Sequence, residues 1–209
     1  MNDVRRATSA ALMAGLLLVM SGCGEPMTDE ELLEQARGVN FAYKAQIADV
    51  QMQIFDGEWD VTGYGDSPET CGNDGYEFDL IRYTPEGWHL DAAPMAIAES
   101  LAEWMDENGW TNVKIRGYSG EIADAVVEGA FPEAHVKLLV ADISPGELYD
   151  HVALYATSTC EPGDAHTIST MRRPGDGERE KLPASEHPTA PPSFGHTEDG
   201  KRRFWNDSE

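Results

Sequence analysis

The first cysteine of this 209-residue chain stands in a pattern that directs covalent lipid attachment. Two arginines precede an apolar run over residues 10–20, and the small residues Ser21 and Gly22 stand directly before Cys23. A positive head, a short apolar segment and small residues at a cleavage point are typical of a secretory signal peptide. A cysteine at that point predicts a bacterial lipoprotein, in which residues 1–22 are removed and the Cys23 sulfur is acylated.

Two other interpretations of this start are open, an uncleaved transmembrane anchor and an ordinary secreted protein. The anchor is disfavoured because a helix needs about 20 apolar residues to cross the hydrocarbon layer, and residues 10–20 are too few. The secreted protein would leave the Cys23 thiol unpaired outside the cell. We therefore expect a lipid anchor, with acyl chains such as palmitate, on the extracytoplasmic face of the cell membrane. Residues 23–27 are then the anchor and its spacer.

The other two cysteines, Cys71 and Cys160, form an even pair in a chain that we expect to be exported. Such a pair in an oxidising compartment predicts a disulfide. A catalytic or metal-binding pair is the alternative, but neither cysteine belongs to a CxxC motif or has a histidine near it in sequence.

Common catalytic fingerprints are absent from the sequence. It contains no HExxH, GxxxxGK[ST], GxGxxG or GxSxG motif, and its six histidines are scattered. Asp56, Glu58 and Asp60 alternate as in a calcium loop, but the glycine at the sixth position and the ligand at the twelfth are missing. The sequence therefore predicts no catalytic residue, no metal site and no cofactor. An enzyme would need a site that only the fold assembles.

Acidic side chains dominate the part of the chain before the last cysteine. Residues 24–160 hold 27 acidic and six basic side chains, a net charge of −21. Such a surface repels nucleic acid, so we exclude nucleic-acid binding. Dense carboxylates often serve solubility alone, and the alternative is attraction of a cationic ligand or a basic partner protein.

The periodicity of apolar residues predicts the elements that position these groups. A capping box at Thr28–Glu31 precedes apolar residues spaced by three or four up to Ile54, which predicts a long helix. A second helix opens at Pro94 and ends at Asn108–Gly109, with Trp110 folding back on it. Alternating segments predict strands over residues 58–64, 76–83, 112–118, 125–131, 135–143 and 149–160, with a loop over 65–75. The order predicts an α+β fold, an antiparallel sheet of about five to six strands with two helices packed on one face.

The composition changes after residue 160. We expect residues 28–160 to form the α+β domain and the proline-rich residues 161–209 to be a mostly disordered tail. Among the aromatic residues, Trp104 lies off the apolar face of its helix, and Trp88 and Tyr64 are further candidates for ligand binding. The alternative role of these aromatic side chains is to fill the domain core.

Several of these features together resemble actinobacterial lipoproteins of the LppA-like kind. They are the residues before Cys23, the acidic first helix, the segment Gly63–Cys71 (GYGDSPETC) and the helix end at Gly109–Trp110. The resemblance implies a location and a fold type but no activity. We predict a non-enzymatic lipoprotein whose domain binds a ligand or an envelope or secreted protein outside the membrane. One alternative is an acidic inhibitor or immunity-type protein directed against a basic secreted protein, and another is an envelope hydrolase.

Overall fold

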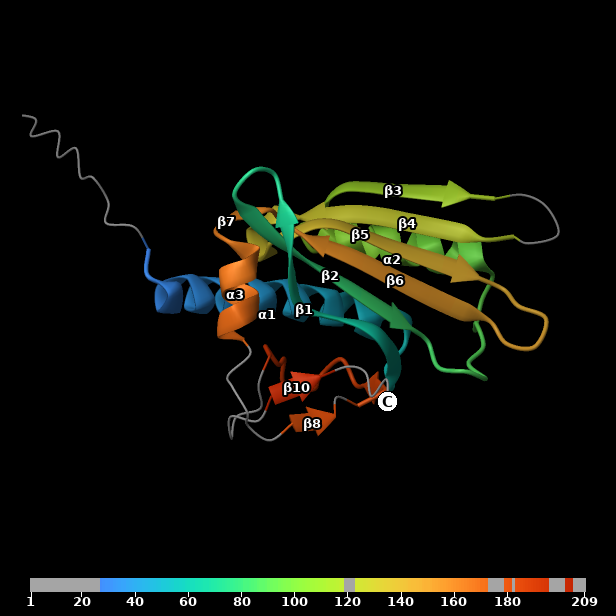
Figure 1. The fold of residues 1–209 in the computed structure, drawn as a ribbon. Coiled ribbons are helices and arrows are strands. Elements are labelled where there is room, and N and C mark those ends of the chain that lie inside the picture. The colour runs from blue at the N-terminus through green and yellow to red at the C-terminus, as the bar shows by residue number, and fades with distance from the viewer. Residues whose placement is uncertain (1–26, 119–122, 173–178, 182, 196–201, 205–209) are drawn as a thin grey trace, which may run out of the picture.

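An antiparallel sheet forms the centre of the computed structural model, which describes residues 27–118, 123–172, 179–181, 183–195 and 202–204 (Figure 1). Seven strands follow the order β3-β4-β5-β6-β2-β1-β9, and β7 pairs with β2 off this path. The strands are β1 (Trp59–Cys71), β2 (Gly75–Tyr83), β3 (Thr111–Gly117), β4 (Ala125–Phe131), β5 (Val136–Ser144), β6 (His151–Ser158), β7 (Glu161–Pro162) and β9 (Ser185–Glu186). The α+β class and the antiparallel sheet are as predicted.

The sheet is larger than the five to six strands predicted, and the described residues contain three α-helices instead of two. The extra elements, β7, β9 and α3 (Ala165–Met171), all come from residues after Cys160. A short 3-10 helix, η1 (Pro132–Ala134), joins β4 to β5, and β8 (Arg179–Lys181) pairs in parallel with β10 (Arg202–Phe204).

Helix α1 (Asp29–Ile54) begins at the predicted capping box. The Thr28 hydroxyl accepts from the Glu31 amide at 3.2 Å, and the Glu31 carboxylate accepts from the Thr28 amide at 2.9 Å. Both bonds satisfy amide groups that a helix start leaves unpaired. The predicted apolar stripe is buried from its first turn to its last but one: Leu32, Ala36, Val39, Tyr43, Ile47 and Val50.

Helix α2 (Pro94–Glu107) ends as the sequence predicts. Gly109 takes a left-handed conformation with φ +87°, which a side chain would disfavour. The Trp110 amide then donates to the Met105 carbonyl at 3.0 Å, and the Trp110 ring is buried. This is the hydrogen bond of a Schellman motif. It fixes the direction in which the chain enters β3.

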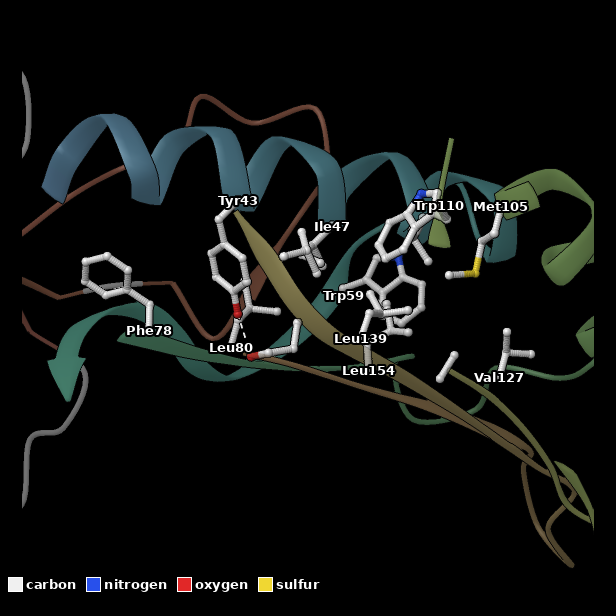
Figure 2. Close-up of a cluster of buried hydrophobic side chains, with 14 of the residues drawn as sticks. Tyr43, Ile47, Trp59, Phe78, Leu80, Met105, Trp110, Val127, Leu139 and Leu154 are labelled. Carbon is white, nitrogen blue, oxygen red and sulfur yellow. Dashed lines mark hydrogen bonds between the residues drawn. The ribbon is translucent and has the colours of Figure 1, made fainter. Parts of the chain in front are cut away.

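The core lies between the sheet and the two long helices. Figure 2 shows Tyr43 and Ile47 of α1 pointing onto the sheet, where Leu80, Leu139 and Leu154 meet them. The Tyr43 hydroxyl donates to the Ala156 carbonyl at 2.5 Å, so the buried phenol keeps a partner. The other large buried side chains in this view are Trp59, Phe78, Met105, Trp110 and Val127.

The segment 65–75, expected to be a loop, is instead the outer half of a hairpin. β1 continues to Cys71, with register shifts against β2 that let Gly65 turn at φ +72°. The turn formers in the sequence therefore mark irregularities within a strand. Cys71 is disulfide-bonded to Cys160, 89 residues later, as predicted. Gly75 lies against this bond, since a Cβ there would stand 2.7 Å from the Cys160 sulfur.

The expectation of a mostly disordered tail after residue 160 is corrected for the residues that the structure describes. Asp164 caps α3 by accepting from the Thr167 amide at 2.6 Å, and Ile168 of α3 is fully buried in the core. Phe194 is buried as well, against Phe78 with ring centroids 5.8 Å apart. Average composition missed this because a few well-placed apolar side chains, with the disulfide beside them, are enough to hold the segment.

Candidate functional site

Residues 183–195, called the strap below, cross the side of the molecule next to α1 and β1. The Val61 amide donates to the Ala184 carbonyl at 2.8 Å, and β9 pairs with the start of β1. Phe194 anchors the other end of the strap in the core. The strap is thus fixed at both ends, and its middle bridges α1.

A pocket of about 250 Å³ lies between α1 and the middle of the strap. Its volume lies slightly below the roughly 300–1,000 Å³ typical of drug-sized ligand sites, so it suits a smaller molecule. The lining combines apolar and charged side chains: Lys44, Ala45, Ala48, Asp49, Gln51 and Met52 from α1, Leu80 and Arg82 from β2, and Glu186, His187, Pro188, Thr189, Ala190, Pro192 and Ser193 from the strap.

Arg82 and Glu186 form a buried ion pair in this lining. One Arg82 amino group lies 3.2 Å from the Glu186 carboxylate, and the other donates to the Gly63 carbonyl at 2.6 Å. The guanidinium also stacks over the Tyr64 ring at 5.5 Å, a favourable cation–π contact. Arg82 is therefore neutralised by Glu186 and held in place, and the pair fastens the strap to β2.

Lys44 brings a second positive charge to the pocket without a carboxylate partner. Its ammonium donates to the Ser193 carbonyl at 2.8 Å, and no carboxylate among the described residues is close enough to form an ion pair with it. Burial lowers the pKa of Lys44 to about 8, against the opposing field of Asp66 and Glu186. An ammonium has three N–H donors, so Lys44 has donors left for a further acceptor.

Gln51 presents another unused donor about two turns further along α1. The residue is 4% exposed, and its side-chain nitrogen has no hydrogen-bond partner among the described residues. A buried amide without a partner costs roughly 1–3 kcal/mol. Such groups in native structures call for an explanation, and an absent ligand or water is one of them.

His187, at the pocket rim, lies between a hydroxyl and a carboxylate. Its Nδ1 is 2.8 Å from the Thr189 hydroxyl, and its Nε2 is 3.2 Å from the Asp56 carboxylate. The same Nδ1 accepts from the Thr189 amide, and the Asp56 side chain is 72% exposed. In a catalytic triad the carboxylate that orients the histidine is buried, and the histidine takes the proton of the nucleophilic hydroxyl. The exposed Asp56 carboxylate does not meet the first of these conditions. The contacts are those of a turn that ties the strap to the end of α1.

The opposite face of the sheet, which Figure 1 views, has neither α1 nor α2 on it. Tyr83 and Tyr155 meet there edge to face, with ring centroids 6.2 Å apart and Tyr155 41% exposed. Strand register places Asp60, Asp79 and Asp142 around them, and none of the three has a basic partner among the described residues. The paired rings and these carboxylates are called the tyrosine patch below.

The three aromatic residues predicted as ligand contacts are not gathered in one site. Tyr64 is buried beside the pocket, where its hydroxyl donates to the Pro183 carbonyl and its ring lies under Arg82. Trp88 packs on Phe55 at the end of α1, with ring centroids 5.9 Å apart. Trp104 is a partly buried residue that packs against the core from α2. All three serve packing, and Tyr64 also positions a pocket residue.

Cys23 and the predicted signal peptide lie outside the described residues. Within the described part of the chain, no helix is long and apolar enough to span a bilayer.

Sequence reasoning missed Lys44, Gln51, Arg82 and Glu186 as a group. One signal was present: Asn40, Lys44 and Gln51 follow each other at intervals of four and seven along the edge of the apolar stripe of α1. Such spacing keeps side chains on one face of a helix. Contact with the strap, 149 residues later in the chain at Ser193, had no signal, because nothing in the composition of residues 183–195 marks them as part of the fold.

The shifted pKa of Lys44 predicts a pH-dependent contribution to stability. Below about pH 8 the folded and unfolded chains both keep this proton, whereas between about 8 and its ordinary value of 10.5 only the unfolded chain does. Stability rises with pH wherever the unfolded chain binds more protons. The charges around Lys44 are Asp66, Glu186, Arg82 and Arg172.

We therefore expect the stability difference between wild type and Lys44→Met to shift in favour of wild type from pH 8 to 10, as measured by urea unfolding. Other groups titrate equally in both proteins, so the difference isolates Lys44. A difference that stays constant over this range would contradict the prediction.

Comparison with known proteins gives no relative on which a function can be based: no family model, no curated protein and no solved structure matches the chain.

Proposed function

We propose that this protein is a lipid-anchored, extracytoplasmic binding protein that holds a small ligand in the pocket under the strap. The observation that carries the proposal is the pair of unused donors, Lys44 and Gln51, beside a cavity of about 250 Å³. Concave sites with an apolar wall and a few convergent polar groups are the usual form of ligand pockets. The residues before Cys23 and the resemblance to LppA-like lipoproteins support the location.

The binding function is tested by blocking the pocket. The mature chain carrying Cys23→Ser, labelled with ¹⁵N, is titrated with a library of small organic acids, amides and amines. We expect shifts of amide signals that cluster at Ala48, Met52 and Thr189, which line the pocket. Ala48→Trp, which fills the pocket, abolishes these shifts, while Gln53→Trp on the exposed side of α1 preserves them. Shifts that survive Ala48→Trp, or none with any compound, would refute the binding function.

The proposed lipid anchor predicts that the protein leaves the membrane fraction when the Cys23 sulfur is replaced by oxygen. In its own cells, the wild-type protein is expected in the membrane pellet, and Cys23→Ser is expected in the soluble fraction, since several acyl chains hold a protein firmly. Cys71→Ser, which removes a different cysteine, serves as the control and leaves the protein in the membrane. Retention of Cys23→Ser in the pellet would contradict a lipid anchor.

A second candidate function uses the tyrosine patch. An exposed and a half-buried aromatic ring among carboxylates attract lysine and arginine side chains through cation–π and ionic contacts. The patch therefore favours the capture of a basic protein, as an inhibitor or immunity-type protein would do. Replacing Asp60, Asp79 and Asp142 together by Asn is expected to weaken binding of a lysine-rich peptide. Wild-type binding should fall steeply with ionic strength, because exposed charges are screened; binding that ignores both changes would rule out this candidate.

A further inference from the structure

The charges around the strap pocket are balanced except at one point. Arg82 is matched by Glu186 at 3.2 Å, and the carboxylate of Asp49 belongs to an exposed residue, where water screens it. Lys44 is left as a partly buried cation whose only described hydrogen bond is to a neutral carbonyl. A buried charge is stable when it is paired, so the position beside Lys44 suits a single negative charge.

Two polar side chains of the pocket lining have hydrogen-bond donors that no described residue uses. Gln51 offers an amide N–H and Lys44 offers ammonium N–H groups. A carboxylate is an acceptor on both of its oxygens. It also carries the negative charge that Lys44 lacks as a partner, whereas an alcohol is neutral and a protonated amine offers donors and a like charge.

Much of the remaining wall is apolar. Ala45, Ala48 and Met52 from α1 face Pro188, Ala190 and Pro192 from the strap. Burial of a ligand methylene against such a wall contributes about 0.8 kcal/mol. A ligand that uses the whole pocket therefore has one charged end and a short hydrocarbon body.

From these three features we infer that the strap pocket binds a small monocarboxylate with an apolar body, its carboxylate between Lys44 and Gln51. This inference rests on the proposed binding function and names its ligand class. A ligand with two negative charges is excluded by the single unmatched cation and by the −21 charge of residues 24–160. The lowered pKa of Lys44 supports a pH effect, since a carboxylate would lose its ionic partner above about pH 8.

The test compares three six-carbon molecules that differ only in their head group. Hexanoate, hexanamide and hexylamine are titrated at pH 7 into the mature Cys23→Ser chain, with dissociation constants from calorimetry and amide shifts. We expect hexanoate to bind at least about tenfold more tightly than hexanamide, the factor for a hydrogen bond to a charged group, and hexylamine to bind most weakly. Hexanoate affinity should fall from pH 7 to 9, and hexanamide affinity should stay constant.

Variants assign this preference to the pocket. Lys44→Met keeps the length of the side chain, removes the charge, and is expected to reduce the preference for hexanoate over hexanamide to less than about threefold. Lys114→Met, at an exposed lysine on β3, is the matched control and keeps the preference. Gln51→Leu is expected to weaken hexanoate and hexanamide alike.

The outcomes separate this inference from the binding function. Equal binding of hexanoate and hexanamide in the pocket would overturn the monocarboxylate inference and leave the binding function intact. Preference for hexanoate that survives Lys44→Met would also overturn it. If hexanoate does not bind, the monocarboxylate inference is overturned. The binding function itself fails only if no compound of the library gives amide shifts that Ala48→Trp abolishes.

Discussion

Reduction of the Cys71–Cys160 disulfide is expected to lower the free energy of unfolding by about 4–5 kcal/mol. The bond closes a loop of 89 residues, and the chain-entropy cost of such a loop in the unfolded protein gives this figure. The fold adds a local reason for a large effect. Cys160 directly precedes β7, and β7 pairs with the start of β2, so the bond also fixes the point at which α3 and the strap depart.

Urea unfolding of the Cys23→Ser chain with and without reductant measures this difference. Cys71→Ser/Cys160→Ser in the same background should match the reduced protein, because both lack the cross-link. For a chain of this size the expected loss corresponds to a fall in melting temperature of about 10–15 °C. A loss in free energy of unfolding below about 1 kcal/mol would contradict the chain-entropy estimate, in which the disulfide restricts the unfolded chain.

Local sequence signals predicted the parts of this fold that local chemistry determines. The capping box at Thr28, the apolar stripe of α1 and the glycine turn before Trp110 each involve residues within five positions of one another. The limits of strands β2 to β6 agree with the prediction to within one or two residues for the same reason, since alternation is a local pattern. The disulfide was predictable because the predicted acylation of Cys23 leaves Cys71 and Cys160 as an even pair.

The candidate site joins residues that are far apart in sequence, so local sequence signals did not predict it. Lys44 and Arg82 look in the sequence like surface cations of an acidic domain, and Glu186 and Ser193 stand in a proline-rich segment. The strap that brings them together ends at Phe194, which is buried in the core but lies far from α1 in sequence and has no periodic pattern around it. This buried aromatic residue holds one end of the strap, and a composition averaged over the whole segment does not reveal the role of one residue.

Phe194→Ala is expected to destabilise the protein by about 3–5 kcal/mol and to abolish ligand binding in the strap pocket. The side chain is 3% exposed and packs edge to face on Phe78, and loss of a buried phenylalanine costs this much because it leaves a cavity. Its neighbours carry polar contacts that depend on it: the Ser193 carbonyl accepts from Lys44, and the Gly195 amide donates to Asp66 at 3.1 Å.

Phe41→Ala on α1, at a partly buried position, is the matched control and should cost less and leave ligand binding intact. Urea unfolding gives the stability, and limited proteolysis reports whether residues 183–195 become cleavable before the domain does. Early cleavage of the strap in Phe194→Ala, with the domain intact, would show that the strap opens as a separate unit. The loss in free energy of unfolding of the domain would then be smaller than the figure given above for Phe194→Ala. Unchanged stability together with unchanged binding would mean that Phe194 does not hold the strap, and that its other contacts, the Arg82–Glu186 ion pair among them, are enough to keep the pocket.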